Sequence, residues 1–165
     1  MPLESTNRYV IRKAFRADIP KIVFIHKDCV FKINSKFYSL KVIKEWVSTI
    51  NQQNVLRQFK STEWVVCEAN SAVIGFAQYS VKDKIIFQIQ VEPEFQNKGV
   101  GATLYKFIEN EFVGFKVDKL VLNSTLNAVS FYQKLGFREV KNIQFRLGKH
   151  SVKMVRMEKF FQENN

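Results

Sequence analysis

The chain has 165 residues, of which 46% are hydrophobic and only three are proline, so it can bury a substantial core in one domain and is too apolar for a disordered protein. Its net charge of +11 is scattered, with no block of five or six basic residues, which disfavours a dedicated nucleic-acid-binding arm. This charge either coats the surface or attracts an anion such as a phosphorylated cofactor, and it disfavours small polycations as substrates.

Targeting and metal signals are absent from the sequence. No apolar run approaches the roughly 20 residues of a membrane span, and the first eight residues lack the apolar core of a secretory signal. Cys29 and Cys67 form no Cys-x-x-Cys pair, and with only two histidines no zinc spacing exists. We therefore predict a cytoplasmic protein with reduced cysteines, no metal and no membrane partner.

The first half of the chain predicts a strand, two helices and a hairpin. The strand covers residues 9–12, and Asp18 and Ser39 are the expected N-caps of the two helices. The buried stripe of the first helix is expected to contain Ile22, Ile25, His26 and Cys29. Two further strands, at 64–68 and 73–79, are separated by a short turn and form the hairpin.

The second half continues with an alternating strand at 85–91. Its apolar face is expected to hold Ile85, Phe87, Ile89 and Val91, opposite Ile86, Gln88 and Gln90. The later elements are a helix after Gly101 that ends at Gly114, a strand at 120–122, a helix at about 127–135, and strands near 137–147 and 152–160. This order predicts an α/β (α+β) fold, a mixed and largely antiparallel sheet with a parallel pair in the middle and about four helices.

A glycine loop lies between the strand at 85–91 and the next helix. It reads Gln96-Asn97-Lys98-Gly99-Val100-Gly101. Glycine lets the backbone approach a phosphate closely, and the first free N–H groups of a helix point at an anion there. Two glycines before a helix are also typical of an ordinary capped turn, so the loop predicts phosphate binding only together with other evidence.

A second motif supplies that evidence. It reads Asn127-Ala128-Val129-Ser130-Phe131-Tyr132-Gln133-Lys134-Leu135-Gly136-Phe137. The two motifs at this spacing resemble the acetyl-CoA-binding core of the GNAT superfamily of N-acyltransferases, and the order of elements is similar from about Tyr9 to Lys159. The resemblance implies a single GNAT-like domain over residues 1–165 with short flexible ends. It also implies transfer of an acetyl group from acetyl-CoA directly to a primary amine, without a metal.

The resemblance also implies how acetyl-CoA binds. The strand before the loop is expected to carry a bulge and to splay from the next parallel strand, and the pantetheine arm fills the gap. The pyrophosphate is expected to bind backbone amides of the loop. The implied contacts are Ile89, Gln90, Val91, Gln96, Asn97, Lys98, Gly99, Val100, Gly101, Ala102, Asn123, Asn127 and Tyr132.

Three residues are candidates for the chemistry. By the resemblance, Tyr132 is the general acid that protonates the departing thiolate, although its spacing also suits a plain core stripe. The Val91 backbone N–H is the expected oxyanion contact. Glutamines 88 and 90 stand where related enzymes often carry a base, so Glu92 is the nearest carboxylate candidate. A water relay, or no dedicated base, is the alternative.

The acceptor is not defined by the sequence. His26, Phe31, Tyr38 and Gln88 are candidates for lining its cleft, with His26 equally interpretable as a core residue. A protein N-terminus, a lysine side chain, an aminoglycoside-like drug and an amino-acid metabolite all remain open, as do a longer acyl chain and a monomer or homodimer. Two rival functions are a catalytically weak CoA-binding regulatory domain and a basic nucleic-acid-binding module.

Overall fold

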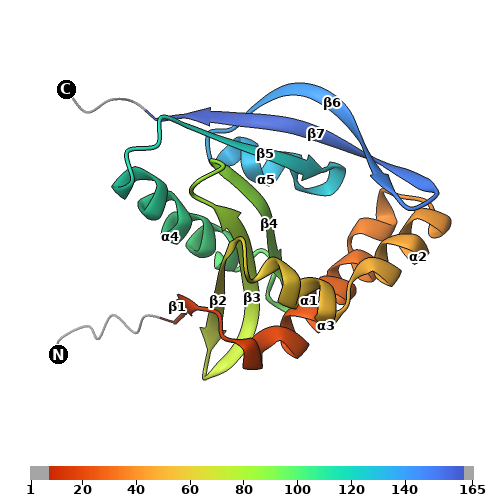
Figure 1. Ribbon diagram of the computed structural model, residues 1–165, viewed down its shortest axis with the longest axis horizontal. Helices are drawn as coiled ribbons and strands as arrows, with labels where there is room; N and C mark the ends of the chain where they lie inside the picture. The colour runs from red at the N-terminus through yellow and green to blue at the C-terminus, as the bar shows by residue number, and fades with distance from the viewer. Residues whose placement is uncertain (1–7, 162–165) are drawn as a thin grey trace.

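The computed structural model describes residues 8–161, so the predicted flexible ends lie largely outside the described range. Seven strands form one sheet in the order β1-β2-β3-β4-β5-β7-β6 (Figure 1). The strands are β1 (Val10–Lys13), β2 (Glu63–Ala69), β3 (Ala72–Ser80), β4 (Ile85–Val91), β5 (Lys119–Thr125), β6 (Arg138–Leu147) and β7 (His150–Phe160). Only the β4–β5 neighbours are parallel, which confirms the predicted mixed sheet with its central parallel pair.

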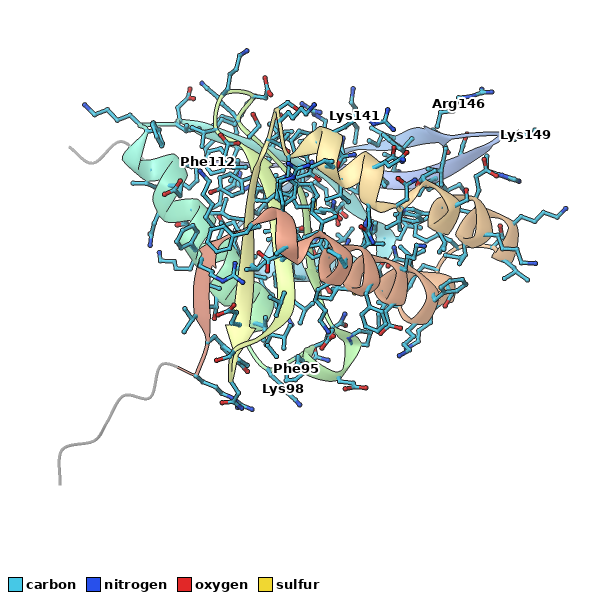
Figure 2. All side chains as sticks on the ribbon, turned by 60° about the horizontal axis from the view of Figure 1, so that its bottom comes forward. Phe95, Lys98, Phe112, Lys141, Arg146 and Lys149 are labelled. Atoms are coloured by element: carbon cyan, nitrogen blue, oxygen red, sulfur yellow. The ribbon has the colours of Figure 1, made fainter. Side chains whose placement is uncertain are left out.

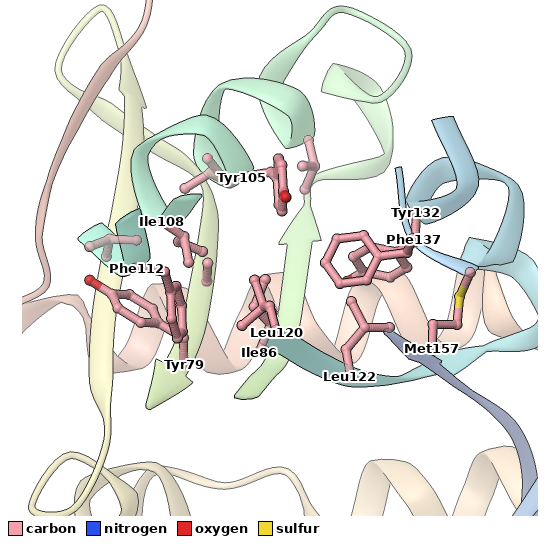
Figure 3. Close-up of a cluster of buried hydrophobic side chains, with 14 of the residues drawn as sticks. Tyr79, Ile86, Tyr105, Ile108, Phe112, Leu120, Leu122, Tyr132, Phe137 and Met157 are labelled. Carbon is pink, nitrogen blue, oxygen red and sulfur yellow. The ribbon is translucent and has the colours of Figure 1, made fainter. Parts of the chain in front are cut away.

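Helices cover both faces of this sheet. The α-helices are α1 (Ile19–Lys32), α2 (Leu40–Thr49), α3 (Gln52–Gln58), α4 (Val100–Gly114) and α5 (Val129–Lys134). Trp64 and Val66 of β2 pack in a cluster with α1, α2 and α3, whereas Val65 and Cys67 pack in a cluster with α4. Because successive strand residues point to opposite faces, the two clusters lie on opposite sides of the sheet. Figure 3 shows the α4 cluster, in which Phe112 and Leu120 are fully buried.

The helix α3 was not predicted, so five α-helices stand within the described residues where about four were expected. Its segment is mostly polar, and a helix of seven residues, about two turns, carries too few apolar residues to show helical spacing. Two contacts stabilise this helix, an N-cap hydrogen bond and one buried side chain. The Asn51 side chain accepts the N–H of Asn54 at 2.9 Å, and Val55 is buried.

The two predicted N-caps behave differently. Ser39 caps α2 as expected, accepting the N–H of Val42 at 3.4 Å. Asp18 precedes α1 but its side chain does not cap the helix. Instead its carboxylate binds the Arg12 guanidinium through two bonds, of 2.8 and 3.0 Å, and accepts the Phe15 N–H at 2.7 Å. These charge-assisted bonds outweigh a neutral cap, and the Arg12 bond holds the pKa of Asp18 below its usual range.

The alternation predicted for β4 is wrong at its middle. In the β3–β4 ladder Gln88 pairs with Gln78 and Ile86 pairs with Tyr79, which leaves Phe87 as the extra residue of a β-bulge. A bulge exchanges the two faces for every residue before it. Ile86 therefore joins the α4 cluster beside Ile89, whereas Phe87 is 43% exposed. The bulge itself is the one that the family resemblance implied.

The parallel pair in the middle of the sheet is short. β4 and β5 pair only at Ile85 with Val121 and at Ile86 with Leu122. Beyond these residues β4 continues to Val91 and β5 to Thr125 without pairing to each other. The two strands therefore separate toward their carboxyl ends, which confirms the expected splay.

Candidate active site

A cavity of about 320 Å³ lies where β4 and β5 separate. The end of α1, the bulged strand β4, the glycine loop with the first turn of α4, the end of β5 and helix α5 contribute to it. Its wall is formed by Cys29, Ile33, Asn34, Phe87, Gln88, Ile89, Gln90, Val91, Gln96, Asn97, Gly101, Asn123, Ser124, Thr125, Asn127, Ala128, Ser130, Phe131, Tyr132 and Lys134. The side chains are mostly amides, hydroxyls and apolar groups, with one lysine and no carboxylate.

The glycine loop turns sharply into α4. Gly99 has a φ of +84° and is the residue before the first helical residue, so the helix begins at Val100 rather than after Gly101. Glycine adopts such a left-handed φ without the steric cost that a side chain brings. Gly101 leaves little space for a side chain, because a Cβ there would lie 3.1 Å from the ring of Phe131. The first free N–H groups of α4 are therefore open to an anion at this end of the cavity.

Two residues of the loop have their own contacts. The ammonium group of Lys98 lies 5.4 Å from the centre of the Phe95 ring, and Lys98 is exposed outside the cavity wall (Figure 2). Its carbonyl accepts the hydroxyl of Tyr9 at 3.2 Å, which ties the loop to the start of the chain's first strand. Val100 is buried in the α4 cluster, and Ala102 follows outside the cavity wall. Val100 and Ala102 can contribute to phosphate binding only through the backbone, whereas a side-chain contact of Lys98 with the phosphates stays a prediction.

The backbone of β4 has a free edge in the gap. The N–H of Glu92 donates to the carbonyl of Ile74 on β3 at 2.9 Å. Because backbone N–H and C=O groups alternate in direction along a strand, those of Ile89 and Val91 point away from β3 and into the gap. The carbonyl of Val91 accepts the Cys29 thiol at 3.0 Å and the Gln96 amide at 3.1 Å. The N–H of Val91 points to the same gap, where β5 has already turned away.

Two buried oxygens in the cavity wall lack a partner. The side-chain oxygens Oδ1 of Asn123 and Asn127 are buried and accept no hydrogen bond from any residue within 8–161. A buried oxygen without a donor is costly, so such atoms point to a ligand with N–H groups or to ordered water. The pantetheine arm of coenzyme A carries two amide N–H groups. The residues in the wall therefore fit that group.

Tyr132 lies on α5, and its ring packs in the α4 cluster (Figure 3). The same residue is part of the cavity wall. Its ring centre lies 5.1 Å from that of Phe131 and 5.7 Å from that of Phe137. Burial raises the pKa of the phenol above its ordinary value, so the proton is retained at neutral pH. The hydroxyl makes no hydrogen bond to the described residues and is free to donate into the cavity.

The candidates for the acceptor cleft are only partly brought together. Gln88 lines the cavity, but His26, Phe31 and Tyr38 do not. His26 packs edge-on against Phe76, with 6.2 Å between ring centres, and Phe31 is 50% exposed. The Tyr38 hydroxyl donates to the carbonyl of Lys153 at 2.6 Å and accepts the N–H of Leu126 at 3.0 Å. Their contacts with an acceptor stay predictions.

The candidate base Glu92 also lies outside the cavity wall. Its carboxylate forms an ion pair with the ammonium group of Lys21 on α1. Any role in proton transfer requires that this pair opens, so the role stays a prediction.

Some wall residues were not predicted from the sequence. Cys29 and Ile33 come from the end of α1, and Asn34, which is 4% exposed, follows directly. The available signal was the spacing that put Cys29 on the buried face of α1. Nothing in the sequence indicated that this face meets the end of β4.

His26 gives a test of the packing between α1 and the sheet. Burial lowers the pKa of this imidazole from 6.5 to about 4. The folded state therefore binds fewer protons than the unfolded state between these values, and its stabilisation is complete above pH 6.5 and is lost as the pH falls toward 4. Between pH 7 and pH 5 we expect a fall in unfolding free energy of about 2 kcal/mol, since one pKa unit corresponds to about 1.4 kcal/mol and pH 5 lies about 1.5 pH units below the ordinary pKa.

The measurement is urea unfolding at pH 7 and pH 5 for the wild type and for His26→Gln. The variant removes the titrating group, and the carboxylates that both proteins share cancel in the comparison. We expect a smaller loss between the two pH values in the variant. An equal loss in both proteins would show that His26 is solvated rather than buried.

The separated strands and the helix N-terminus between them are the arrangement of an N-acyltransferase fold. Residues 34–160 match the family model described as Acetyltransferase (GNAT) domain, and the chain belongs to this family of acyltransferases. It is 29% identical over 73 residues to an uncharacterized N-acetyltransferase, ycf52, of Pyropia yezoensis. That match covers 42% of this chain and 42% of the relative, so the chain matches less than half the length of this relative.

Solved structures share the whole fold. A GCN5-related N-acetyltransferase of Rhodopseudomonas palustris superposes with a TM-score of 0.87 at 16% identity, over 92% of this chain and 95% of that one. The paiA N-acetyltransferase of Thermoplasma acidophilum, solved with coenzyme A, superposes with a TM-score of 0.79 at 21% identity, over 93% and 99% of the two chains. At these identities the likeness establishes the fold.

Residues 8–161 contain neither a membrane-spanning helix nor a metal-binding cluster. None of the helices there has the length and hydrophobicity needed to cross a bilayer. No group of three or more histidine, cysteine, aspartate or glutamate side chains in that range is placed to hold a metal ion.

Proposed function

We propose that this GNAT acetyltransferase moves the acetyl group of acetyl-CoA directly to a primary amine while both are bound. The observation that carries this proposal is the cavity between β4 and β5, which has a helix N-terminus at one end and Tyr132 in its wall. A direct transfer needs both reactants in one space, and this cavity is continuous from the glycine loop to the end of α1.

The residues of the cavity suggest how the cosubstrate is held. The free N–H groups of α4 would bind the diphosphate, and the free edge of β4 at Ile89 and Val91 would pair with the pantetheine arm as a missing strand does. Asn123 and Asn127 would accept the N–H groups of that arm through their unpartnered oxygens. Acetyl-CoA supplies an acyl group already activated as a thioester.

The chain's own groups would then assist the transfer. As the neutral amine forms its bond to the carbonyl carbon, the Val91 N–H stabilises the negative charge on the carbonyl oxygen. When the carbon–sulfur bond breaks, Tyr132 donates its proton to the departing thiolate. The amine releases one proton to solvent, and solvent returns one to the Tyr132 phenolate, so the products are an amide and a free thiol and the enzyme is restored.

The proton that the amine releases must reach a base or solvent. No carboxylate lines the cavity, but Gln88 and Gln90 do, and they are joined by a chain of amide hydrogen bonds to Gln78. Amides cannot take a proton near neutral pH, so they would hold an ordered water that passes it to solvent. The same observation favours the second candidate function, a CoA-binding domain with weak catalysis.

Calorimetric and thermal-shift titrations with acetyl-CoA and coenzyme A test the binding part. At a ligand concentration about 100 times the Kd, we expect a stabilisation of roughly 2.7 kcal/mol. Release of free thiol in the presence of a panel of primary amines tests the chemistry. Binding without thiol release for any amine would favour the regulatory domain, and a lack of binding would exclude both candidates. The cytoplasmic location, the single domain and the monomer-or-homodimer state stay predictions.

A further inference from the structure

A row of polar side chains leads from the cavity wall across the sheet to a basic surface. In the β5–β7 ladder Asn123 lies opposite Arg156, and in the β7–β6 ladder Arg156 lies opposite Lys141. Paired residues of neighbouring strands point to the same face, with Cβ atoms about 5 Å apart. Val152 and Met154 of β7 belong to the α1-side cluster, so by the alternation of the strand Arg156 also lies on the α1 side.

The positive charges of this row have no carboxylate partner. Neither Arg156 nor Lys141 has an acidic oxygen within 4 Å among residues 8–161. Glu158, the next acidic residue along β7, already lies 3.4 Å from the ammonium group of Lys119. Arg156 is half-buried and lies opposite Asn123 of the cavity wall, and Lys141 is exposed on β6 (Figure 2). The row therefore offers an uncompensated positive charge next to the cavity.

The part of the cavity nearest this row contains amides but no acid. Asn34, Gln88, Gln90 and Asn123 line it. Such a wall can hydrogen-bond a neutral amine but has no carboxylate that would hold an ammonium ion or a polyamine. Charge recognition of an acceptor must therefore come from a group other than its amine.

The cosubstrate does not need this charge for its diphosphate. Helix α4, whose N-terminus follows the glycine loop, packs in the cluster that contains Val155 and Met157. These residues alternate with Arg156 along β7 and point to the opposite face of the sheet. The diphosphate site and the Arg156 row are thus on different sides.

We propose that the acceptor is a small primary amine that also carries a carboxylate or phosphate group, and that Arg156, assisted by Lys141, binds this anion. The inference rests on the proposed acetyl transfer and specifies its substrate class. A guanidinium presents paired N–H donors to either anion, and one strand spacing of about 4.8 Å separates its strand from that of Asn123. A molecule of a few bonds can therefore reach from Arg156 to the gap between β4 and β5.

The experiment compares amines that carry the anion with close analogues that lack it. The pairs are β-alanine with β-alaninamide, L-phenylalanine with L-phenylalaninamide, and O-phosphoethanolamine with ethanolamine, each assayed by thiol release from acetyl-CoA. We expect kcat/KM to be about 10-fold or more higher for the charged member of at least one pair, as a charge-assisted hydrogen bond implies. The productive pair identifies whether a carboxylate or a phosphate is bound.

In the variant Arg156→Gln, the ratio of kcat/KM between the charged and neutral members should fall close to one, without a change in the Kd for coenzyme A. The variant Arg156→Lys should retain part of the preference. Lys153→Gln removes the same charge from the same strand but on the other face, so it should keep the preference. Equal rates within every pair, faster reaction of the neutral members, or a preference that survives in Arg156→Gln would overturn the inference. Coenzyme A binding without acetylation of any charged member would also overturn it and leave the cofactor site intact. A lack of coenzyme A binding would instead overturn the proposed function.

Discussion

Leucine in place of Gly101 is expected to lower the affinity for coenzyme A by about 10- to 100-fold, the equivalent of one or two charge-assisted hydrogen bonds of the diphosphate. The first atom of the new side chain would already lie 3.1 Å from the Phe131 ring, so the rest must enter the cavity or displace α5. Gly101 also stands in the first turn of α4, where the free N–H groups are. Isothermal titration calorimetry with coenzyme A measures the change.

A graded series separates this effect from general destabilisation. Gly101→Ala adds one atom, which a small shift of Phe131 can accommodate, so its affinity should lie between those of the wild type and the leucine variant. Gly114→Leu places the same side chain at the other end of α4, where an added Cβ meets nothing within 4 Å, and should bind coenzyme A normally. Unchanged affinity in a folded Gly101→Leu protein would exclude the helix N-terminus as the diphosphate site.

Phenylalanine in place of Tyr132 is expected to lower kcat about 100-fold or more, the range of a lost general acid, with nearly unchanged affinity for acetyl-CoA. The ring contacts with Phe131 and Phe137 remain in the variant, and the lost hydroxyl has no partner among the described residues. Because burial raises the pKa of Tyr132, its proton is available through the neutral and mildly alkaline range. The Tyr132 contribution to kcat should therefore persist up to pH 10.

The matched control is Tyr79→Phe. Tyr79 is buried in the same cluster, but its hydroxyl lies 3.5 Å from Glu111 and it does not line the cavity. Its turnover should equal that of the wild type. If Tyr132→Phe retains full turnover as well, the thiolate leaves without a protein acid and the tyrosine is only a packing residue. Steady-state thiol release over a range of acetyl-CoA concentrations separates kcat from KM in both variants.

Local patterns in the sequence were sufficient for most elements. The apolar spacing predicted the positions of α1, α2 and α4, and the hairpin and the glycine loop follow from turn residues with short-range effects. The wrong or missing predictions concern residues whose structure depends on contacts with other elements. Asp18 does not cap α1 because its carboxylate binds the guanidinium of Arg12 on β1. The short helix α3 forms because Val55 is buried against the α1-side cluster. The bulge at Phe87 depends on the register with β3 and reverses the alternation read along β4.

The family of this protein could be predicted from the sequence, because the glycine loop and the Asn127 to Phe137 motif are each one continuous stretch of chain. Their chemistry depends on local backbone geometry. The residues that surround the cavity, in contrast, follow from the tertiary structure. Cys29 and Arg156 are 127 positions apart in the chain. The Cys29 thiol donates to the carbonyl of Val91 at the end of β4, and the pairing of β7 with β5 brings Arg156 beside Asn123 of the same cavity wall. Such neighbours arise from strand order and burial, which no periodicity along the chain encodes.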